Sequence, residues 1–278
     1  MKPWLLVVIL NLSIDLLEDM NKLPSKSPKQ LWSRDELILA FNLYCKTPFS
    51  KIHHNNKDII ELASIIHRSP SAVALKLSNF ARLDPALQQR NIAGMSHGSK
   101  SEIAIWEEFS NNWEEMAFQS EVILAEIQHQ NIEDILDIAK QDIPPQGKER
   151  ESIVKTRVNQ KFFRLMILAS YNGRCCITGI AIPELLVASH IVPWSIDQTN
   201  RLNPHNGLCL NALHDIAFDK GLFTITSDYK IVISSLIDAD PASNKWFSKF
   251  NEMKITLPQK FIPATEFMEY HQQHVFRP

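Results

Sequence analysis

Residues 185–221 constrain the fold of this chain more than any other segment. Residues 185–188 form an apolar run of strand length, and such a run holds the nearby His190 at the end of a strand. Pro193 cannot donate to a ladder and interrupts regular pairing directly afterwards. Residues 207–210 have the length and apolar character of a second short strand. We therefore predict two strands separated by a polar loop.

A helix is predicted directly after the second strand, over residues 211–218. Asn211 is a suitable N-cap, and Gly221 supplies the left-handed conformation that commonly ends a helix. This order places Asn206 in the loop before the second strand and His214 on the helix. Together with His190, these side chains can converge on one divalent cation and one phosphate. Phosphodiester hydrolysis needs such groups, because a base must activate water and a cation must stabilise charge on the phosphate.

The pattern resembles the HNH endonucleases over roughly residues 157–235. The resemblance rests on Ser189-His190-Ile191-Val192-Pro193-Trp194, Asn206-Gly207-Leu208, His214 and Phe218-Asp219-Lys220-Gly221. It implies a ββα-metal fold that cuts nucleic acid. It further implies that His190 is the base, that His214 is a metal ligand, and that Asn206 orients the base or binds the metal. The implied cofactor is a divalent metal ion, Mg²⁺ or Mn²⁺.

One position departs from the family pattern. An Asp or His usually precedes the base and binds the metal, whereas this chain has Ser189. A hydroxyl is a poorer ligand than a carboxylate or an imidazole. The metal is then held by His214 with another group, or bound weakly, or cleavage is impaired. Asp219 is a further candidate ligand, although it lies roughly 140° around an ideal helix from His214.

The cysteines predict no structural zinc. There are four, Cys45, Cys175, Cys176 and Cys209, and no Cys-x-x-Cys pair is among them. Adjacent cysteines rarely bridge each other. We interpret all four as reduced thiols of a cytoplasmic protein.

The net charge of −2 gives no overall attraction to nucleic acid, so any affinity must come from local patches. One patch precedes the nuclease motif. Arg157, Lys161 and Arg164 recur at i, i+4 and i+7 on a predicted amphipathic helix, which makes a basic ridge about 10 Å long. Such a ridge can contact the phosphates of double-stranded DNA; the alternative is a solvated helix face.

The N-terminal half predicts a separate helical region. Ser33 and Glu36 form a capping box, and Ser69 with Pro70 begins a third helix after a tight turn. These helices suggest a helix-turn-helix or Myb-like unit in which Ser and Asn side chains of the third helix can read base edges. Lys76 or Arg82 can then meet a phosphate. A further capping box at Ser99 begins a long helix expected to continue through Met116.

We predict an α+β chain composed of a helical N-terminal domain and a ββα-metal nuclease domain with an added β-hairpin. The predicted boundaries are an uncertain N-terminal segment over 1–30 with Met20 as an alternative start, a helical domain over 31–143, a linker over 144–150, and the nuclease domain over 151–278. The hairpin is expected from residues 222–226 and 231–235.

The leading interpretation is a metal-dependent DNA endonuclease, with a restriction or phage-defence role implied by resemblance alone. One alternative is a DNA-binding or regulatory protein whose HNH fold no longer cuts. Another is a secreted nuclease, because residues 4–10 are continuously apolar; this run is too short to span a membrane. We expect double-stranded DNA as the partner and no membrane, and the sequence is compatible with a homodimer.

Overall fold

A computed structural model describes residues 31–90, 99–135 and 147–278. The predicted N-terminal segment 1–30, with Met20, lies outside the described residues. The chain from Arg34 to Pro278 forms one compact unit. It contains many helices and two small antiparallel sheets among the described residues, which confirms the α+β class. None of the helices in these ranges has both the length and the apolar character needed to span a membrane.

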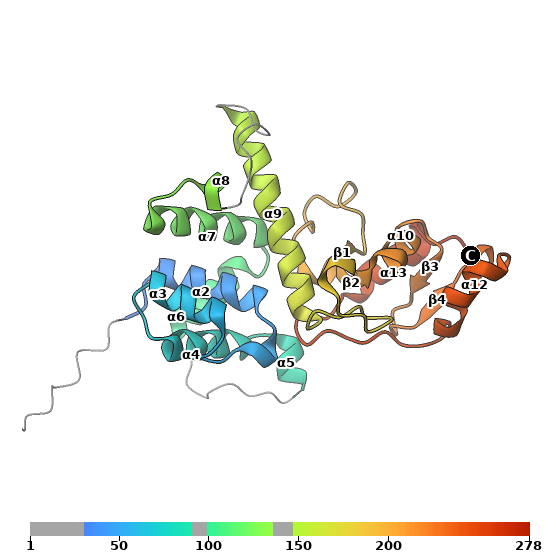
Figure 1. Ribbon diagram of the computed structural model, residues 1–278, viewed down its shortest axis with the longest axis horizontal. Coiled ribbons are helices and arrows are strands. Elements are labelled where there is room, and N and C mark those ends of the chain that lie inside the picture. Colours follow the sequence, from blue (N-terminus) through green and yellow to red (C-terminus); the bar gives the residue numbers. More distant parts are fainter. Residues whose placement is uncertain (1–30, 91–98, 136–146) are drawn as a thin grey trace, which may run out of the picture. The chain divides into compact units, whose positions relative to one another are not determined.

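Figure 1 shows the order of the elements. The first part of the unit contains α2 (Arg34–Lys46), η1 (Phe49–Lys51), α3 (Lys57–Ile65), α4 (Pro70–Ala81), α5 (Pro85–Gln89), α6 (Lys100–Phe109), α7 (Trp113–Gln128) and α8 (Ile132–Ile135). The second part contains α9 (Lys148–Ser170), η3 (Pro183–Leu185), β1 (Leu186–His190), η4 (Pro204–Asn206), β2 (Gly207–Asn211), α10 (Ala212–Asp219), β3 (Phe223–Ile225), β4 (Ile231–Ile233), α11 (Ser235–Asp238), α12 (Pro241–Phe247), η5 (Ser248–Phe250) and α13 (Thr265–His274).

Helix α2 forms the centre of the helical region. It contacts α4, α6, α7 and α9, and its Phe41 and Tyr44 side chains are completely buried. The Phe41 ring lies 4.9 Å from the ring of Phe80 and 5.4 Å from that of Trp106. Aromatic pairs at these distances add to the stabilisation that burial alone provides. The apolar pattern of this helix is therefore explained by the core that it forms.

Two of the predicted helix starts in this region are confirmed. The Ser69 hydroxyl accepts a hydrogen bond from the Ala72 amide at the start of α4, and Pro70 is the first residue of that helix. Ser99 and Glu102 form the predicted capping box of α6. The expected continuation to Met116 is wrong, because residues 110–112 separate α6 from α7. This segment consists of Ser and Asn, which favour turns over helix interiors.

The structure corrects the prediction that Lys76 meets a phosphate. Lys76 is buried and forms an ion pair with Glu102, which is itself completely buried. The Asn79 amide donates to the same Glu102 carboxylate at 3.0 Å. Removing either partner from such a pair would leave a buried charge uncompensated. Lys76 and Asn79 therefore join α4 to α6 and are unavailable to contact DNA.

Helix α9 connects the helical region to the sheet of the second region. It contacts α2 and α7, and it also contacts β1 and β2. Residues 144–146 of the predicted linker lie outside the described residues, and Lys148 already belongs to the helix. Gly147 precedes it with a φ of 102°. The two predicted domains therefore share a core through α9, and their exact boundary stays a prediction.

The predicted strand, loop, strand and helix arrangement is present. Strands β1 and β2 pair antiparallel, with Ser189 opposite Leu208 and His190 opposite Gly207. The Asn211 side chain caps α10 by accepting a hydrogen bond from the His214 amide at 3.1 Å. This cap satisfies a backbone donor that the first turn of the helix leaves unpaired.

Two glycines fix how this unit packs. A Cβ atom at Gly207 would lie 2.3 Å from Ile167 Cδ1, so any larger residue would require the Ile167 side chain on α9 to shift. Gly221 has a φ of 67°, and a Cβ atom there would lie 2.0 Å from the Val275 carbonyl oxygen. It is the predicted residue that ends α10.

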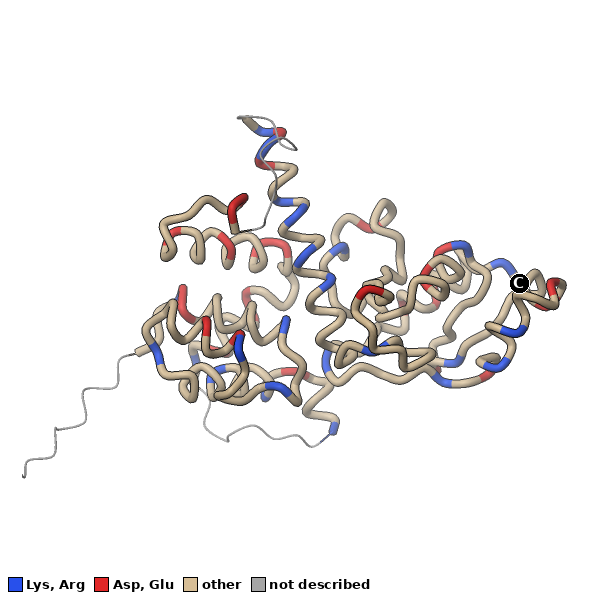
Figure 2. The backbone as a smooth tube through the Cα atoms, viewed as in Figure 1, with Lys and Arg blue, Asp and Glu red and all other residues tan. Residues whose placement is uncertain are grey.

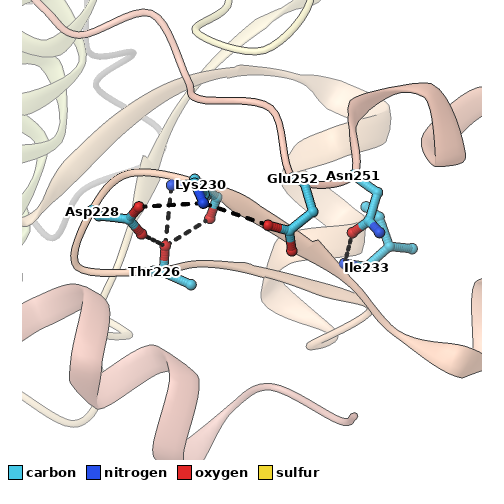
Figure 3. A network of polar contacts seen from close by, with 6 residues as sticks. All are labelled: Thr226, Asp228, Lys230, Ile233, Asn251 and Glu252. Atoms are coloured by element: carbon cyan, nitrogen blue, oxygen red, sulfur yellow. Dashed lines mark hydrogen bonds and ion pairs between the residues drawn. The ribbon is translucent and has the colours of Figure 1, made fainter.

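The predicted hairpin is also present, as β3 and β4, with Phe223 opposite Ile233. Figure 3 shows the polar contacts that hold its turn. The Lys230 ammonium lies 3.8 Å from the Asp228 carboxylate and 3.7 Å from that of Glu252. The Ile233 amide donates to the Asn251 side chain at 3.1 Å. These contacts attach the chain after η5 to the hairpin.

His271 attaches α13 to the ββα unit. Its imidazole is buried and lies 3.7 Å from the Phe218 ring in a stacked arrangement. Nε2 donates to the Phe218 carbonyl at 3.1 Å, and Nδ1 accepts from the Thr224 hydroxyl at 2.9 Å. Burial lowers the pKa of His271 to about 4. This histidine therefore packs against α10 and β3 and holds α13 to them.

Candidate nuclease site

Strand β1 places Ser189 and His190 on opposite faces of the sheet, because successive residues of a strand alternate. His190 faces α9, where its ring stacks on Phe163 with 3.9 Å between centroids and 7° between planes. Trp194 meets the same ring edge-on at 5.3 Å. A cavity of about 320 Å³ opens here, lined by Gln160, Phe163, Arg164, Val187, Ala188, His190 and Trp194. The cavity gives a reactant room beside the imidazole.

The hydrogen bonding of His190 determines which ring nitrogen can act as a base. Nε2 lies 2.8 Å from the Arg201 carbonyl oxygen. A carbonyl can only accept, so Nε2 carries the proton and donates it in this bond. Nδ1 is then the nitrogen with a lone pair. Burial lowers the pKa of His190 below its usual value, although the bond to Arg201 opposes the shift. The imidazole is therefore neutral at physiological pH and able to accept a proton.

Asn206 closes the loop that brings the Arg201 carbonyl to His190. Its Oδ1 accepts from the Val192 amide at 2.8 Å, and its Nδ2 donates to the Val192 and Asn200 carbonyls at 3.2 and 3.3 Å. The side chain is only 1% exposed. The buried, occupied Oδ1 favours the orienting role over the metal-ligand role, the two alternatives that the sequence left open for Asn206.

Further polar contacts hold the same loop. The Arg201 side chain donates from Nε to the Trp194 carbonyl at 3.0 Å, and its guanidinium lies 5.1 Å from the centroid of the Trp194 ring. Asp197 accepts from the Asn200 side chain at 2.7 Å. Contacts between Arg201 and Trp194 and between Asp197 and Asn200 thus hold the loop between β1 and β2. This loop carries the carbonyl that binds His190.

His214 lies on the buried face of α10 and is 4% exposed. Its Nδ1 lies 3.0 Å from Asn211 Oδ1, so Nδ1 is the donor. Nε2 is buried without a hydrogen-bond partner. The ring is surrounded by Phe223, Phe247 and Phe250, with centroids 5.0 to 6.1 Å away. Burial and, to a smaller extent, the nearby Lys249 charge lower its pKa to about 4.

The other face of α10 carries two carboxylates, Asp215 and Asp219. Burial raises the pKa of both, and the charge of Asp215 further raises that of Asp219. Residues four apart are neighbours on a helix surface, which accounts for this repulsion. The Ser189 hydroxyl faces Asp215 and lowers its pKa in opposition to burial, although its geometry falls short of a regular hydrogen bond. The prediction had overlooked Asp215, whose i, i+4 spacing from Asp219 was the available signal.

The structure does not join the three residues predicted to be catalytic. In the part of the chain that is described, no hydrogen bond links His190, Asn206 and His214 to one another, since each has other partners. No group of three or more His, Cys, Asp or Glu side chains within the described ranges is arranged to hold a metal ion. The four cysteines are buried free thiols, and the prediction of no structural zinc stays a prediction.

The donors on α10 nevertheless fit a hard divalent cation. Mg²⁺ commonly binds through one or two carboxylates and fills its remaining positions with water and substrate phosphate. Asp215 and Asp219 supply two such carboxylates, with the Ser189 oxygen beside Asp215. His214 Nε2 also has an available lone pair, and the Asn211 bond orients the ring as a ligating histidine requires. However, this nitrogen is buried, and three phenylalanine rings pack around the imidazole.

The basic residues predicted to contact DNA lie on the exposed face of α9. Arg157, Lys161 and Arg164 are all exposed. Arg164 differs from the other two, because its guanidinium donates to the Leu186 carbonyl at 2.8 Å and to the Pro183 carbonyl at 3.2 Å. These bonds attach α9 to the start of β1. Arg164 therefore has a structural function in addition to any contact with phosphate.

Comparison with known proteins agrees with this geometry. The family model described as HNH endonuclease matches residues 175–226. The match spans β1, β2, α10 and β3, and it contains every candidate catalytic and metal-binding residue. No curated protein matches the chain. The match and the ββα arrangement together show that this chain carries a domain of the HNH endonuclease family.

Proposed function

We propose that this protein is a metal-dependent endonuclease that hydrolyses phosphodiester bonds in DNA. The observation that carries the proposal is the state of His190. Its Nε2 is occupied by the Arg201 carbonyl, its Nδ1 has a lone pair, and it stands at the end of β1 in a family-matched ββα unit. A restriction or phage-defence role is supported only by the sequence resemblance.

In this proposal His190 is the general base. Its Nδ1 accepts a proton from water, and the imidazolium formed is stabilised through the Nε2 bond to the Arg201 carbonyl. Stacking on Phe163 fixes the plane of the ring, and Asn206 holds the loop that carries the accepting carbonyl. Such positioning of a base adds to the rate, because no reorientation is needed during the reaction.

Asp215 and Asp219 are proposed to hold the cation, with Ser189 as a weaker neighbour. A bound Mg²⁺ or Mn²⁺ supplies Lewis-acid stabilisation of the charge that develops on the phosphate. The raised pKa of each aspartate reflects an environment that disfavours two uncompensated negative charges. His214 remains the alternative ligand that the family resemblance implies. Its use would require the cluster of Phe223, Phe247 and Phe250 to open.

The substrate is proposed to lie along α9. Figure 2 shows basic residues recurring along this helix. Arg157 and Lys161 are exposed and form no ion pair with any residue in the described ranges. They can therefore meet phosphates without breaking an existing contact. The same helix contacts β1, so it connects this basic surface directly to the strand that carries His190.

The experiment that tests the proposed function is plasmid cleavage by the full chain. We expect nicked and linear products with Mg²⁺ or Mn²⁺ and none after chelation with EDTA. A protein that binds plasmid but never cuts it, with either metal, would contradict the proposal. That outcome would favour the non-cutting DNA-binding alternative, which the serine at position 189 and the buried Nε2 of His214 both support.

Substituting Ser189→Asp is expected to raise the affinity for Mn²⁺. The new carboxylate would lie beside Asp215 and add a charged hard oxygen to the two aspartates of α10. We expect an increase of roughly tenfold or more in calorimetric titration, comparable to the 10- to 100-fold effects of altering a metal site. Asp215→Asn should abolish this gain, whereas His214→Gln should preserve it. Loss of binding in His214→Gln alone would assign the metal to His214.

Reversing the charges of Arg157 and Lys161 to Glu is expected to weaken DNA binding similarly for all sequences. Each lost phosphate contact should reduce the slope of log affinity against log salt by about 1. Gel-shift titrations over a range of salt concentrations measure this slope. The matched control is Lys254→Glu, an exposed lysine on the chain after the β3–β4 hairpin. An unchanged slope in the double variant would show that this face of α9 is merely solvated.

A further inference from the structure

Trp246 is exposed in a position that packing does not explain. The residue lies near the end of α12, and 62% of its surface is accessible. Its neighbour Phe247 is buried and packs against His214, with 5.0 Å between ring centroids. The helix therefore directs Phe247 into the ββα unit and Trp246 to solvent. An exposed tryptophan has a large apolar surface that the fold leaves in water.

Two exposed lysines flank this tryptophan. Lys245 precedes it, and Lys249 follows three residues later in η5. Neither forms an ion pair with any residue that the structure describes. Lys249 lies close enough to His214 for its charge to lower the pKa of that imidazole. Its ammonium also lies 4.9 Å from the centroid of the Phe250 ring, which in turn lies 5.5 Å from that of His214. The surface formed by Lys245, Trp246 and Lys249 therefore adjoins the side chains that pack against α10.

Helix stabilisation explains the lysines but not the tryptophan. Asp240 caps the N-terminus of α12 by accepting from the Ser243 amide at 3.1 Å, and cations at the opposite end complement the helix dipole. An apolar ring contributes nothing to that effect. The core of a protein interface is usually depleted in lysine, which argues against a protein partner. By contrast, single-stranded nucleic acid is commonly bound by aromatic rings flanked by basic residues.

We propose that Trp246 stacks on an unpaired base of the DNA substrate, with Lys245 and Lys249 contacting the adjacent phosphates. The proposal rests on the proposed nuclease function and adds a substrate preference to it. DNA with a locally unpaired segment beside the cleavage site should bind more tightly than a continuous duplex. Base stacking on an aromatic side chain tolerates any sequence, because every base has a π face. The surface therefore selects DNA structure without selecting sequence.

The test compares two labelled DNAs, a continuous duplex and the same duplex with a short internal bubble. Binding is measured by fluorescence anisotropy in the His190→Ala background, so that the DNA stays intact. We expect Trp246→Ala to weaken bubble binding by roughly 5- to 150-fold, the range that loss of one stacked base implies. Continuous-duplex binding should change little, and Trp246→Phe should retain most of the preference. Leu236→Ala, which removes an exposed apolar side chain on α11, is the matched control.

Several results would overturn the proposal. Equal affinity of Trp246→Ala and its parent for the bubble would show that no base stacks there. An equal loss for both DNAs would indicate a general contact without stacking. Sedimentation that finds a dimer dissociated by Trp246→Ala would assign the surface to self-association. If the wild-type protein cut plasmid in the presence of metal and only the Trp246 effect were missing, the proposed nuclease function would stand. If the wild type neither cut nor bound DNA, both the stacking proposal and the proposed nuclease function would be wrong.

Discussion

His190→Ala is expected to reduce plasmid cleavage by roughly 100- to 10,000-fold, the range attributed to a positioned general base. The structure gives the reason: Nδ1 is the one ring nitrogen of His190 with an available lone pair, since Nε2 donates to the Arg201 carbonyl. DNA affinity should stay nearly unchanged, because the imidazole is mostly buried and contributes little to phosphate binding. Initial cleavage rates and gel shifts on the same preparations measure the two effects.

His54→Ala is a matched control, because His54 is an exposed histidine in the helical region. It should cut at the wild-type rate. Near wild-type cleavage by His190→Ala would show that the base has been assigned to the wrong residue. An equal loss of cleavage and binding would indicate that the substitution disturbs the fold around Phe163 and Trp194.

The pH dependence of cleavage gives a separate check of the same residue. A base must be neutral to act, and burial lowers the pKa of His190 below its usual value of about 6.5. The sign follows directly: a lower pKa keeps the imidazole neutral at lower pH. Cleavage should therefore persist below pH 6.5 and decline only as the pH approaches the lowered value. A decline centred at or above pH 6.5 would contradict the buried environment of the ring.

Local sequence signals predicted the ββα unit well, because each of its features depends on few residues. Asn211 caps the helix through its own side chain, and Gly221 ends it through a positive φ. The alternation of a strand fixes the faces to which Ser189 and His190 point. These features require no knowledge of distant contacts, so the sequence was sufficient to predict them.

The environments of individual side chains could not be predicted in the same way. Lys76 has the sequence context of a phosphate contact, yet the buried Glu102 carboxylate pairs with it from another helix. His214 lies at the expected place on α10, but three phenylalanines from distant segments enclose its ring. In both cases tertiary packing determines whether the side chain reaches solvent. Periodicity indicates which face a residue occupies without indicating what covers that face.

Lys260 is a further residue whose environment depends on distant segments, and the sequence assigned no role to it. Its ammonium is completely buried and donates to the carbonyls of Tyr44 and Thr47 at 2.6 and 2.8 Å, and to that of Cys45 at 3.2 Å. These carbonyls belong to the last turn of α2 and the residue after it. The last carbonyls of a helix have no partner within it. Lys260 thus satisfies them from more than two hundred positions away in the sequence.

Lys260→Met is expected to destabilise the protein by about 3–5 kcal/mol, the usual effect of removing one partner from a buried charged contact. Methionine keeps the unbranched stem but leaves three buried carbonyls without a donor. Because domains are typically stable by about 5–15 kcal/mol, this loss would remove a large share of the total. Urea unfolding monitored by tryptophan fluorescence measures this loss as a lower midpoint at a similar slope.

The exposed Lys254→Met is the matched control, with an expected change within about 0.5 kcal/mol. A loss below about 1 kcal/mol in Lys260→Met would show that the α2 carbonyls find other donors, and that this lysine does not join the C-terminal segment to the helical region.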